Sequence, residues 1–224
     1  MSDEPVSKPE EFKPMPGDVL FTRNETVLGR LIRWMTKVPG SPKSLTGHVC
    51  IFTVGDRVVE AYFPVTRAST WDWYQGHIAK NNIQWCVMRY KPGLDEIKKV
   101  RLESWLEAKI GELYSLPELF GTMMLDAIMQ KILRMPFCFF RILGRFCAET
   151  VCSGLVGKTC CFLGMMPDSI DVPYMKRGVV ETVPIPTDLV DPDELLDWQT
   201  YSSTWVQVAK SDKWDSVRRM RLCR

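Results

Sequence analysis

The chain has 224 residues, of which 46% are hydrophobic and 25% charged. This balance is typical of a globular domain with a substantial core and excludes an intrinsically disordered chain. The formal net charge of +2 gives no electrostatic basis for binding nucleic acid, so we expect no nucleic-acid partner.

The two ends of the chain differ in composition from the rest. Residues 1–16 are polar and rich in Pro, Glu and Lys, which predicts a flexible leader without the apolar core of a signal peptide. Residues 211–224 form a basic tail, which we interpret as a solvated segment. We expect a single domain over residues 17–210, in a protein that is cytoplasmic as synthesised.

The first third of the chain is predicted to be rich in strands, because short apolar and β-branched runs alternate with Gly and Pro. The Gly55-Asp56 pair between two such runs is typical of a β-hairpin turn. The expected elements are a strand at Asp18–Thr22, a short amphipathic helix at Val27–Lys37, a hairpin of His48–Val54 and Arg57–Phe63, and a strand at Ile83–Arg89.

Helices dominate the middle of the chain, and the whole pattern predicts an α+β fold. The expected elements are a surface helix at Leu94–Ile110, a helical insertion at about 117–143, a helix at Thr150–Leu163 that ends at Gly164, and short strands at Val179–Val183 and Trp205–Val208. The most apolar stretch, Leu119–Leu143, contains four charged side chains. A membrane span needs ~20 nearly uncharged residues, so we expect no transmembrane segment.

Eight cysteines are distributed through the chain. A protein made without an export signal starts in a reducing compartment, so we expect free thiols, most of them packed as small apolar residues. No Cys-x-x-Cys pair is present, and His48 and His77 do not have the spacing of a zinc site. The sequence therefore predicts no metal.

The hairpin carries a candidate acid–base pair. His48 begins one strand and Glu60 lies near the end of the other, at approximately opposite positions within reach of cross-strand side chains. A carboxylate beside an imidazole fixes its tautomer and favours its protonated form. An isolated pair of this kind is also compatible with a surface contact on a strand.

The segment that follows the predicted helical insertion changes that interpretation. Residues 152–156 read Cys-Ser-Gly-Leu-Val, and Gly164 follows Cys152 by twelve positions. This segment resembles the nucleophile helix of the NlpC-type cell-wall peptidases. The histidine segment of that family, in which a polar third residue follows the histidine by twelve positions, resembles residues 47–61, with His48 as the histidine and Glu60 as the third residue.

The chain order His-Glu-Cys is the reverse of the standard family and resembles its circularly permuted branch. This branch includes the YiiX-like bacterial enzymes and, more distantly, the lecithin:retinol acyltransferase group. Residues 17–23 resemble its opening strand, and Gly111-x-x-Tyr114 resembles a segment that implies a substrate-binding role for Tyr114. The resemblance covers about residues 16–165 and implies a papain-like fold, in which a small barrel-like antiparallel sheet packs against helices.

Two cysteines compete for the role of nucleophile. Permuted members usually have Glu two positions after the cysteine, a pattern that fits Cys147 in Cys-Ala-Glu, whereas Cys152 has Gly154 there. Cys152 matches more positions of the motif and the distance to Gly164, so we prefer it and keep Cys147 as the alternative.

The resemblance implies a cysteine hydrolase without a cofactor, in which Cys152 attacks, His48 transfers protons, Glu60 orients His48 and an acyl-enzyme forms. The first substrate we expect is a peptide of the bacterial cell wall. A lipid or acyl ester is the alternative, because the predicted insertion is rich in Met and Phe, which can line an acyl-chain cleft. A non-catalytic binding module is the second alternative.

Overall fold

The computed structural model describes residues 12–23, 30, 46–114, 152–176, 179–187, 192–211 and 214. Two predicted elements lie outside the described residues, namely the helix at residues 27–37 and the helical insertion at 117–143. Within the described part of the chain, no helix is long and apolar enough to cross a membrane.

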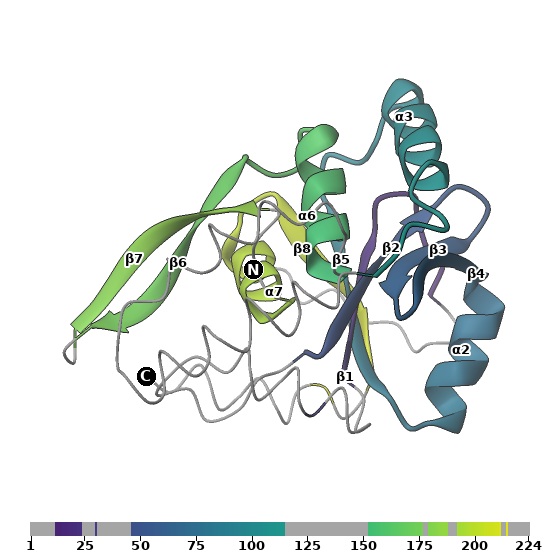
Figure 1. Ribbon diagram of the computed structural model, residues 1–224, viewed down its shortest axis with the longest axis horizontal. Helices are drawn as coiled ribbons and strands as arrows, with labels where there is room; N and C mark the ends of the chain where they lie inside the picture. The colour runs from purple at the N-terminus through teal and green to yellow at the C-terminus, as the bar shows by residue number, and fades with distance from the viewer. Residues whose placement is uncertain are drawn as a thin grey trace.

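A six-stranded antiparallel sheet forms the centre of the fold, in the order β4-β3-β2-β1-β5-β8. Its strands are β1 (Val19–Arg23), β2 (His48–Thr53), β3 (Arg57–Tyr62), β4 (Val65–Thr70), β5 (Gln84–Tyr90) and β8 (Trp205–Lys210). A separate two-stranded ribbon, β6 (Ser169–Lys176) with β7 (Val179–Pro186), projects from one side of this body (Figure 1).

Helices cover both faces of the sheet. They are α2 (Trp71–Lys80), α3 (Glu96–Glu107), α6 (Cys152–Phe162) and α7 (Pro192–Tyr201). Alternate residues of a strand point to opposite faces, and β2 shows this clearly. Val49 and Ile51 pack in one core cluster with α3, α6 and α7, whereas Cys50 and Phe52 pack in the other with α2.

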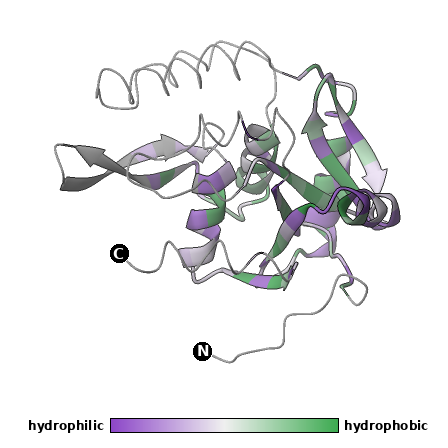
Figure 2. Ribbon diagram, turned by 90° about the horizontal axis from the view of Figure 1, so that it is seen from below, coloured by the Kyte–Doolittle hydropathy of each residue, from purple (hydrophilic) through white to green (hydrophobic). Residues whose placement is uncertain are grey.

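Burial on both faces explains why the central strands are apolar at nearly every position instead of alternating. In the hydropathy view (Figure 2), hydrophobic colour is concentrated in the middle of the molecule and polar colour on its outer helices and turns. The predicted α+β class is therefore confirmed, as an antiparallel sheet packed against helices.

The predicted hairpin, the opening strand and the helix after Leu94 are all present. Asp95 caps α3 by accepting a hydrogen bond from the backbone N–H of Lys98 at 2.7 Å, an interaction that fixes where a helix begins. Gly164 follows α6 with a φ of +67°, the left-handed conformation that ends many helices. Four elements were not predicted from the sequence: β4, α2, β6 and α7.

Candidate active site

His48 and Glu60 are in direct contact, as the hairpin predicts. Nε2 of His48 lies 2.7 Å from Oε2 of Glu60. Their exact register differs from the predicted one, because Thr53 pairs with Arg57 and Ile51 with Val59. Continuing this register puts Cys50 opposite Glu60, so His48 is its diagonal neighbour on the same face of the sheet.

The turn between β2 and β3 is responsible for that shared face. Three residues separate the paired Thr53 and Arg57, and two of them, Gly55 and Asp56, have positive φ. A loop of two residues would pair residue 54 with residue 57 and would move the register by one. Because side chains alternate along a strand, Glu60 would then point to the face opposite His48.

Glu60 is buried and accepts two further hydrogen bonds. Its side chain is 1% exposed. Nε of Arg67, on β4, donates to Oε1 at 2.8 Å, and the hydroxyl of Tyr74, on α2, donates to Oε2 at 3.0 Å. Burying a carboxylate costs free energy unless it is paired and hydrogen-bonded. The three partners of Glu60 satisfy both of its oxygens.

These contacts determine the charge of the pair. Burial alone would raise the pKa of Glu60, but the hydrogen bonds and positive charges of His48 and Arg67 lower it to about 2. Burial alone would lower the pKa of His48, but hydrogen bonds to Cys152 and Glu60, together with their negative charges, raise it to about 10. At neutral pH the site therefore holds an imidazolium beside a carboxylate.

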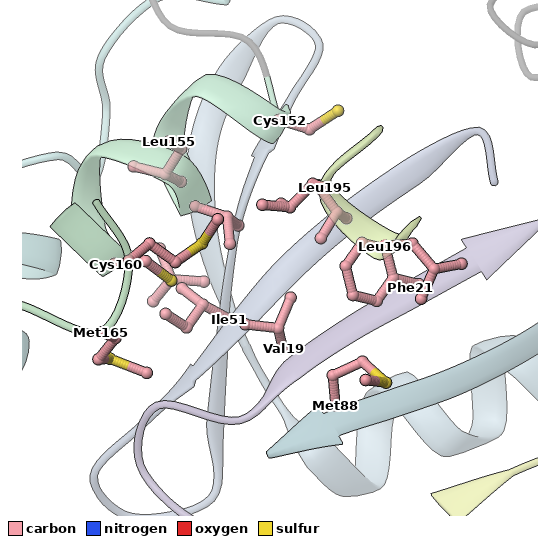
Figure 3. Packing of buried hydrophobic residues seen from close by; sticks show 14 of the residues in the cluster. Val19, Phe21, Ile51, Met88, Cys152, Leu155, Cys160, Met165, Leu195 and Leu196 are labelled. Carbon is pink, nitrogen blue, oxygen red and sulfur yellow. The ribbon is translucent and has the colours of Figure 1, made fainter. Parts of the chain in front are cut away.

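Cys152 is the first residue of α6, and its thiol lies next to the same imidazole, with which it forms a hydrogen bond. Because Nε2 of His48 is engaged by Glu60, the nitrogen left for Cys152 is Nδ1. Figure 3 shows the sulfur of Cys152 directed away from the core side chains Leu155 and Cys160 of the same helix.

The packing of α6 keeps Cys152 in this position. Leu155 and Val156 are fully buried in the core cluster that also contains Leu195 of α7. On another side, Gly157 lies so close to the chain that a Cβ added there would be 2.2 Å from the carbonyl oxygen of Thr187. The helix therefore has little freedom to slide or rotate relative to the sheet.

The remaining predicted residues are placed as follows. Tyr114 is buried in the core cluster that contains Cys152, and its backbone N–H donates to the carbonyl of Pro64 at 2.9 Å. Cys147 lies outside the described residues, so its role as alternative nucleophile stays a prediction. His77 lies in α2 and stacks on Trp73, with ring centroids 5.2 Å apart.

Arg67 and Tyr74 are the members of the site that sequence reasoning missed. A signal for the helix that carries Tyr74 exists, since Trp71, Tyr74 and Ile78 have helical spacing and are its buried residues. Thr70 before them is a typical N-cap and accepts a hydrogen bond from the backbone N–H of Trp73 at 3.3 Å.

Five cysteines belong to the described residues, and all five are free thiols: Cys50, Cys86, Cys152, Cys160 and Cys161. Cys160 is buried in the core, and burial raises its pKa, so it is a poor nucleophile at neutral pH. The other three cysteines of the sequence are outside the described residues.

Comparison with known proteins finds a likeness in structure but none in sequence. No family model matches the chain, and no curated protein matches it. The chain is similar to the crystal structure of the metalloprotein yiiX from Escherichia coli O157:H7, with a TM-score of 0.52 and 15% sequence identity over 89% of this chain and 99% of that one. The fold is therefore YiiX-like, as the sequence predicted, and an identity this low shows the fold alone.

The description of yiiX as a metalloprotein applies to that protein. Among the described residues of the present chain, no three His, Cys, Asp or Glu side chains form a group that could hold a metal ion. The residues around His48 instead satisfy one another, because Oε2 of Glu60 is already shared by the imidazole and by the hydroxyl of Tyr74.

Proposed function

We propose that this protein is a cysteine-dependent hydrolase that works through an acyl-enzyme, with Cys152 as nucleophile, His48 as general base and acid, and Glu60 as the residue that orients His48. The observation that carries the proposal is the position of Cys152. Its thiol lies at the start of a helix, beside an imidazole that is hydrogen-bonded to a buried carboxylate. A thiol, an imidazole and a third polar group are the three parts that a thiol hydrolase needs.

The first half of the reaction forms the acyl-enzyme. With His48 protonated, the Cys152 sulfur attacks the substrate carbonyl as a thiolate, and a carbon–sulfur bond forms. The backbone N–H of Cys152 donates to the oxygen on which negative charge develops. His48 then gives its proton to the leaving group as the bond between that group and the carbonyl carbon breaks.

The second half releases the product. Water attacks the thioester while His48 accepts one of its protons, the carbon–sulfur bond breaks, and the sulfur leaves as the thiolate that began the cycle. Glu60 stays ionised throughout and keeps Nε2 of His48 as the donor to its Oε2 atom. One nitrogen of the imidazole therefore orients the ring, and the other transfers protons.

As substrate we propose a peptide amide of the bacterial cell wall, on the resemblance of residues 47–61 and 152–164 to the NlpC-type segments. The chain order His48, Glu60, Cys152 is, in this proposal, the circularly permuted order of a papain-like enzyme. The alternative of a lipid or acyl ester depends on residues 117–143, which lie outside the described residues, so no observation in the structure favours it.

The first test is selective labelling of the native protein with a trace of iodoacetamide at neutral pH, followed by peptide mass spectrometry. We expect Cys152 to react first. The partly exposed Cys161, whose thiol donates to the carbonyl of Pro167 at 3.1 Å, is the internal control and should react more slowly. Cys152→Ala should remove the fast label and also abolish hydrolysis of murein peptides, whereas Cys161→Ala should leave both unchanged.

The alternatives predict different results. Loss of the fast label and of hydrolysis in Cys147→Ala, with Cys152→Ala active, would move the nucleophile to Cys147. Hydrolysis of acyl esters but not of murein peptides would keep the mechanism and change the substrate. Slow, unselective labelling of every cysteine would leave the fold as a binding module and refute the proposed function.

A further inference from the structure

We propose that Arg67 and Tyr74 are positioning residues of this site, forming a clamp on Glu60 that fixes the carboxylate so that Oε2 meets Nε2 of His48. The proposal rests on the proposed function, because a positioning residue acts only through His48 and Cys152. Neither residue belongs to the His48, Glu60 and Cys152 set that the sequence motifs supply, and both come from elements next to the motif-bearing hairpin.

The two anchors act on different atoms of the carboxylate. Arg67 engages Oε1 at 2.8 Å, and Tyr74 engages Oε2 at 3.0 Å, the same oxygen that lies 2.7 Å from the imidazole. Rotation about the last torsion of a glutamate side chain is otherwise broad and weakly restricted. Donors at both oxygens remove this freedom and present a fixed acceptor to His48.

Arg67 is itself held in place by aromatic rings. Its guanidinium carbon lies 4.0 Å from the ring centroid of Tyr62 and 5.4 Å from that of Trp73. The Tyr62 ring in turn meets the His48 ring edge-on, with centroids 5.9 Å apart and an interplanar angle of 87°. A planar guanidinium stacks on such rings and a lysine ammonium does not, so Lys is not an equivalent residue here.

Tyr74 supplies a neutral donor from α2. Its ring is buried, and its hydroxyl also accepts a hydrogen bond from the thiol of Cys50, with sulfur and oxygen 3.7 Å apart. Burial, followed by the neighbouring Cys50 and Glu60, holds the pKa of Tyr74 well above its usual value. The hydroxyl therefore keeps its proton and remains a donor to Glu60.

The groups that face Glu60 come from three elements. His48 and Cys50 lie on β2, Arg67 on β4 and Tyr74 on α2, while Cys152 of α6 is a further neighbour of His48. The guanidinium of Arg67 places a positive charge beside Oε1 of Glu60. This charge keeps Glu60 ionised at acidic pH. A protonated Glu60 would no longer attract the imidazolium of His48.

The experiment compares wild-type protein with Arg67→Met, Arg67→Lys and Tyr74→Phe. The first measurement is the carboxyl ¹³C chemical shift of Glu60 during acid titration. The second is the alkylation rate of Cys152 by iodoacetamide from about pH 2 to 8. Arg57→Met is the matched control, because Arg57 is 34% exposed, compared with 38% for Arg67, and pairs with the surface residue Glu107 instead of Glu60. Circular dichroism checks that each variant is folded.

For Arg67→Met we expect the Glu60 titration to move upward by at least about 1 pH unit, the lower end of the effect of an arginine on a neighbouring carboxylate. The acid limb of the alkylation profile should move with it. Arg67→Lys should recover the acid limb in part but not the rate at pH 7. Tyr74→Phe should lower the alkylation rate about fivefold, the effect of one lost hydrogen bond. Arg57→Met should match wild type.

Three results would overturn the clamp. One is a Glu60 titration that is the same in Arg67→Met, Tyr74→Phe and wild type. The second is a shifted Glu60 titration with alkylation of Cys152 unchanged, which would make both residues structural. The third is an unreactive Cys152 in the wild-type protein. This result would refute the proposed function as well, whereas the first two would refute only the clamp.

Discussion

Glu60→Gln isolates the contribution of one buried charge to folding. The substitution preserves the shape of the side chain and removes its charge, while Tyr74 can still donate to the amide oxygen. A carboxyl with a pKa of about 2 in the folded protein and 4.5 in the unfolded chain stabilises the fold by about 3 kcal/mol. Because the folded pKa is the lower one, this stabilisation is present above pH 4.5 and is lost as the pH falls towards 2.

His48 adds a second pH dependence of the opposite sign. Its pKa rises from 6.5 to about 10 against the effect of burial, through hydrogen bonds with Cys152 and Glu60 and through their charges. The associated stabilisation is complete below pH 6.5 and is lost as the pH rises through 10. Only part of it depends on Glu60, because Cys152 contributes to the same shift.

The difference in stability between wild type and Glu60→Gln should therefore be largest between pH 4.5 and 6.5 and should shrink on both sides. We expect the variant to be less stable by about 2 kcal/mol near pH 5.5. This is below the linkage value because Arg67 is 38% exposed, so its freed guanidinium is rehydrated by water.

Urea unfolding followed by fluorescence of the eight tryptophans measures this difference without the ionic screening that guanidinium would add. Glu107→Gln is the matched control: Glu107 is 47% exposed and pairs with Arg57 on the surface, so its loss should cost less than about 1 kcal/mol at every pH. A Glu60→Gln penalty that is independent of pH, or no larger than that of the control, would refute the reasoning.

Two further predictions concern packing and the thiols. Gly157→Ala should destabilise the protein by about 1–3 kcal/mol, because the added Cβ would lie 2.2 Å from a backbone oxygen of Thr187. Gly76→Ala, at a helical position with nothing within 4 Å, should stabilise it by about 0.5–1 kcal/mol. Thermal unfolding measures both effects, and equal effects would contradict the packing argument. Denatured, non-reduced protein should titrate as close to eight free thiols with Ellman's reagent, since eight cysteines are present and the five in the described residues are free; a count of four would mean that disulfides form.

The sequence predicted the parts of the site that local rules determine. A Gly-Asp turn between two apolar runs predicts the β2–β3 hairpin and the proximity of His48 and Glu60 across it. Their shared face depends on the three-residue loop, which the sequence did not predict. The end of the helix predicted at Thr150–Leu163 follows from Gly164. The predicted features depend on residues close to one another in the chain, and each was found at or within two residues of its predicted position.

The missed parts depend on pairing and burial between elements. Arg67 lies on β4, a strand whose side chains are mixed in polarity. This segment forms a strand by pairing with β3, in a register that puts Arg67 opposite Glu60. Tyr74 faces Glu60 because α2 packs on the opposite face of the sheet from α6. No local pattern states which face of a sheet a helix will cover, so neither residue could be connected to the site from spacing.

The site combines groups from both faces of the sheet. Glu60 needs burial and donors, and α2 with β4 provides them on one side of the sheet. Cys152 needs a helix N-terminus, and α6 provides it on the other side. His48, at the first residue of β2, has one ring nitrogen on Glu60 and the other available to Cys152. These contacts join elements that are distant in the chain, so the site depends on the packing of α2 and α6 on opposite faces of the sheet.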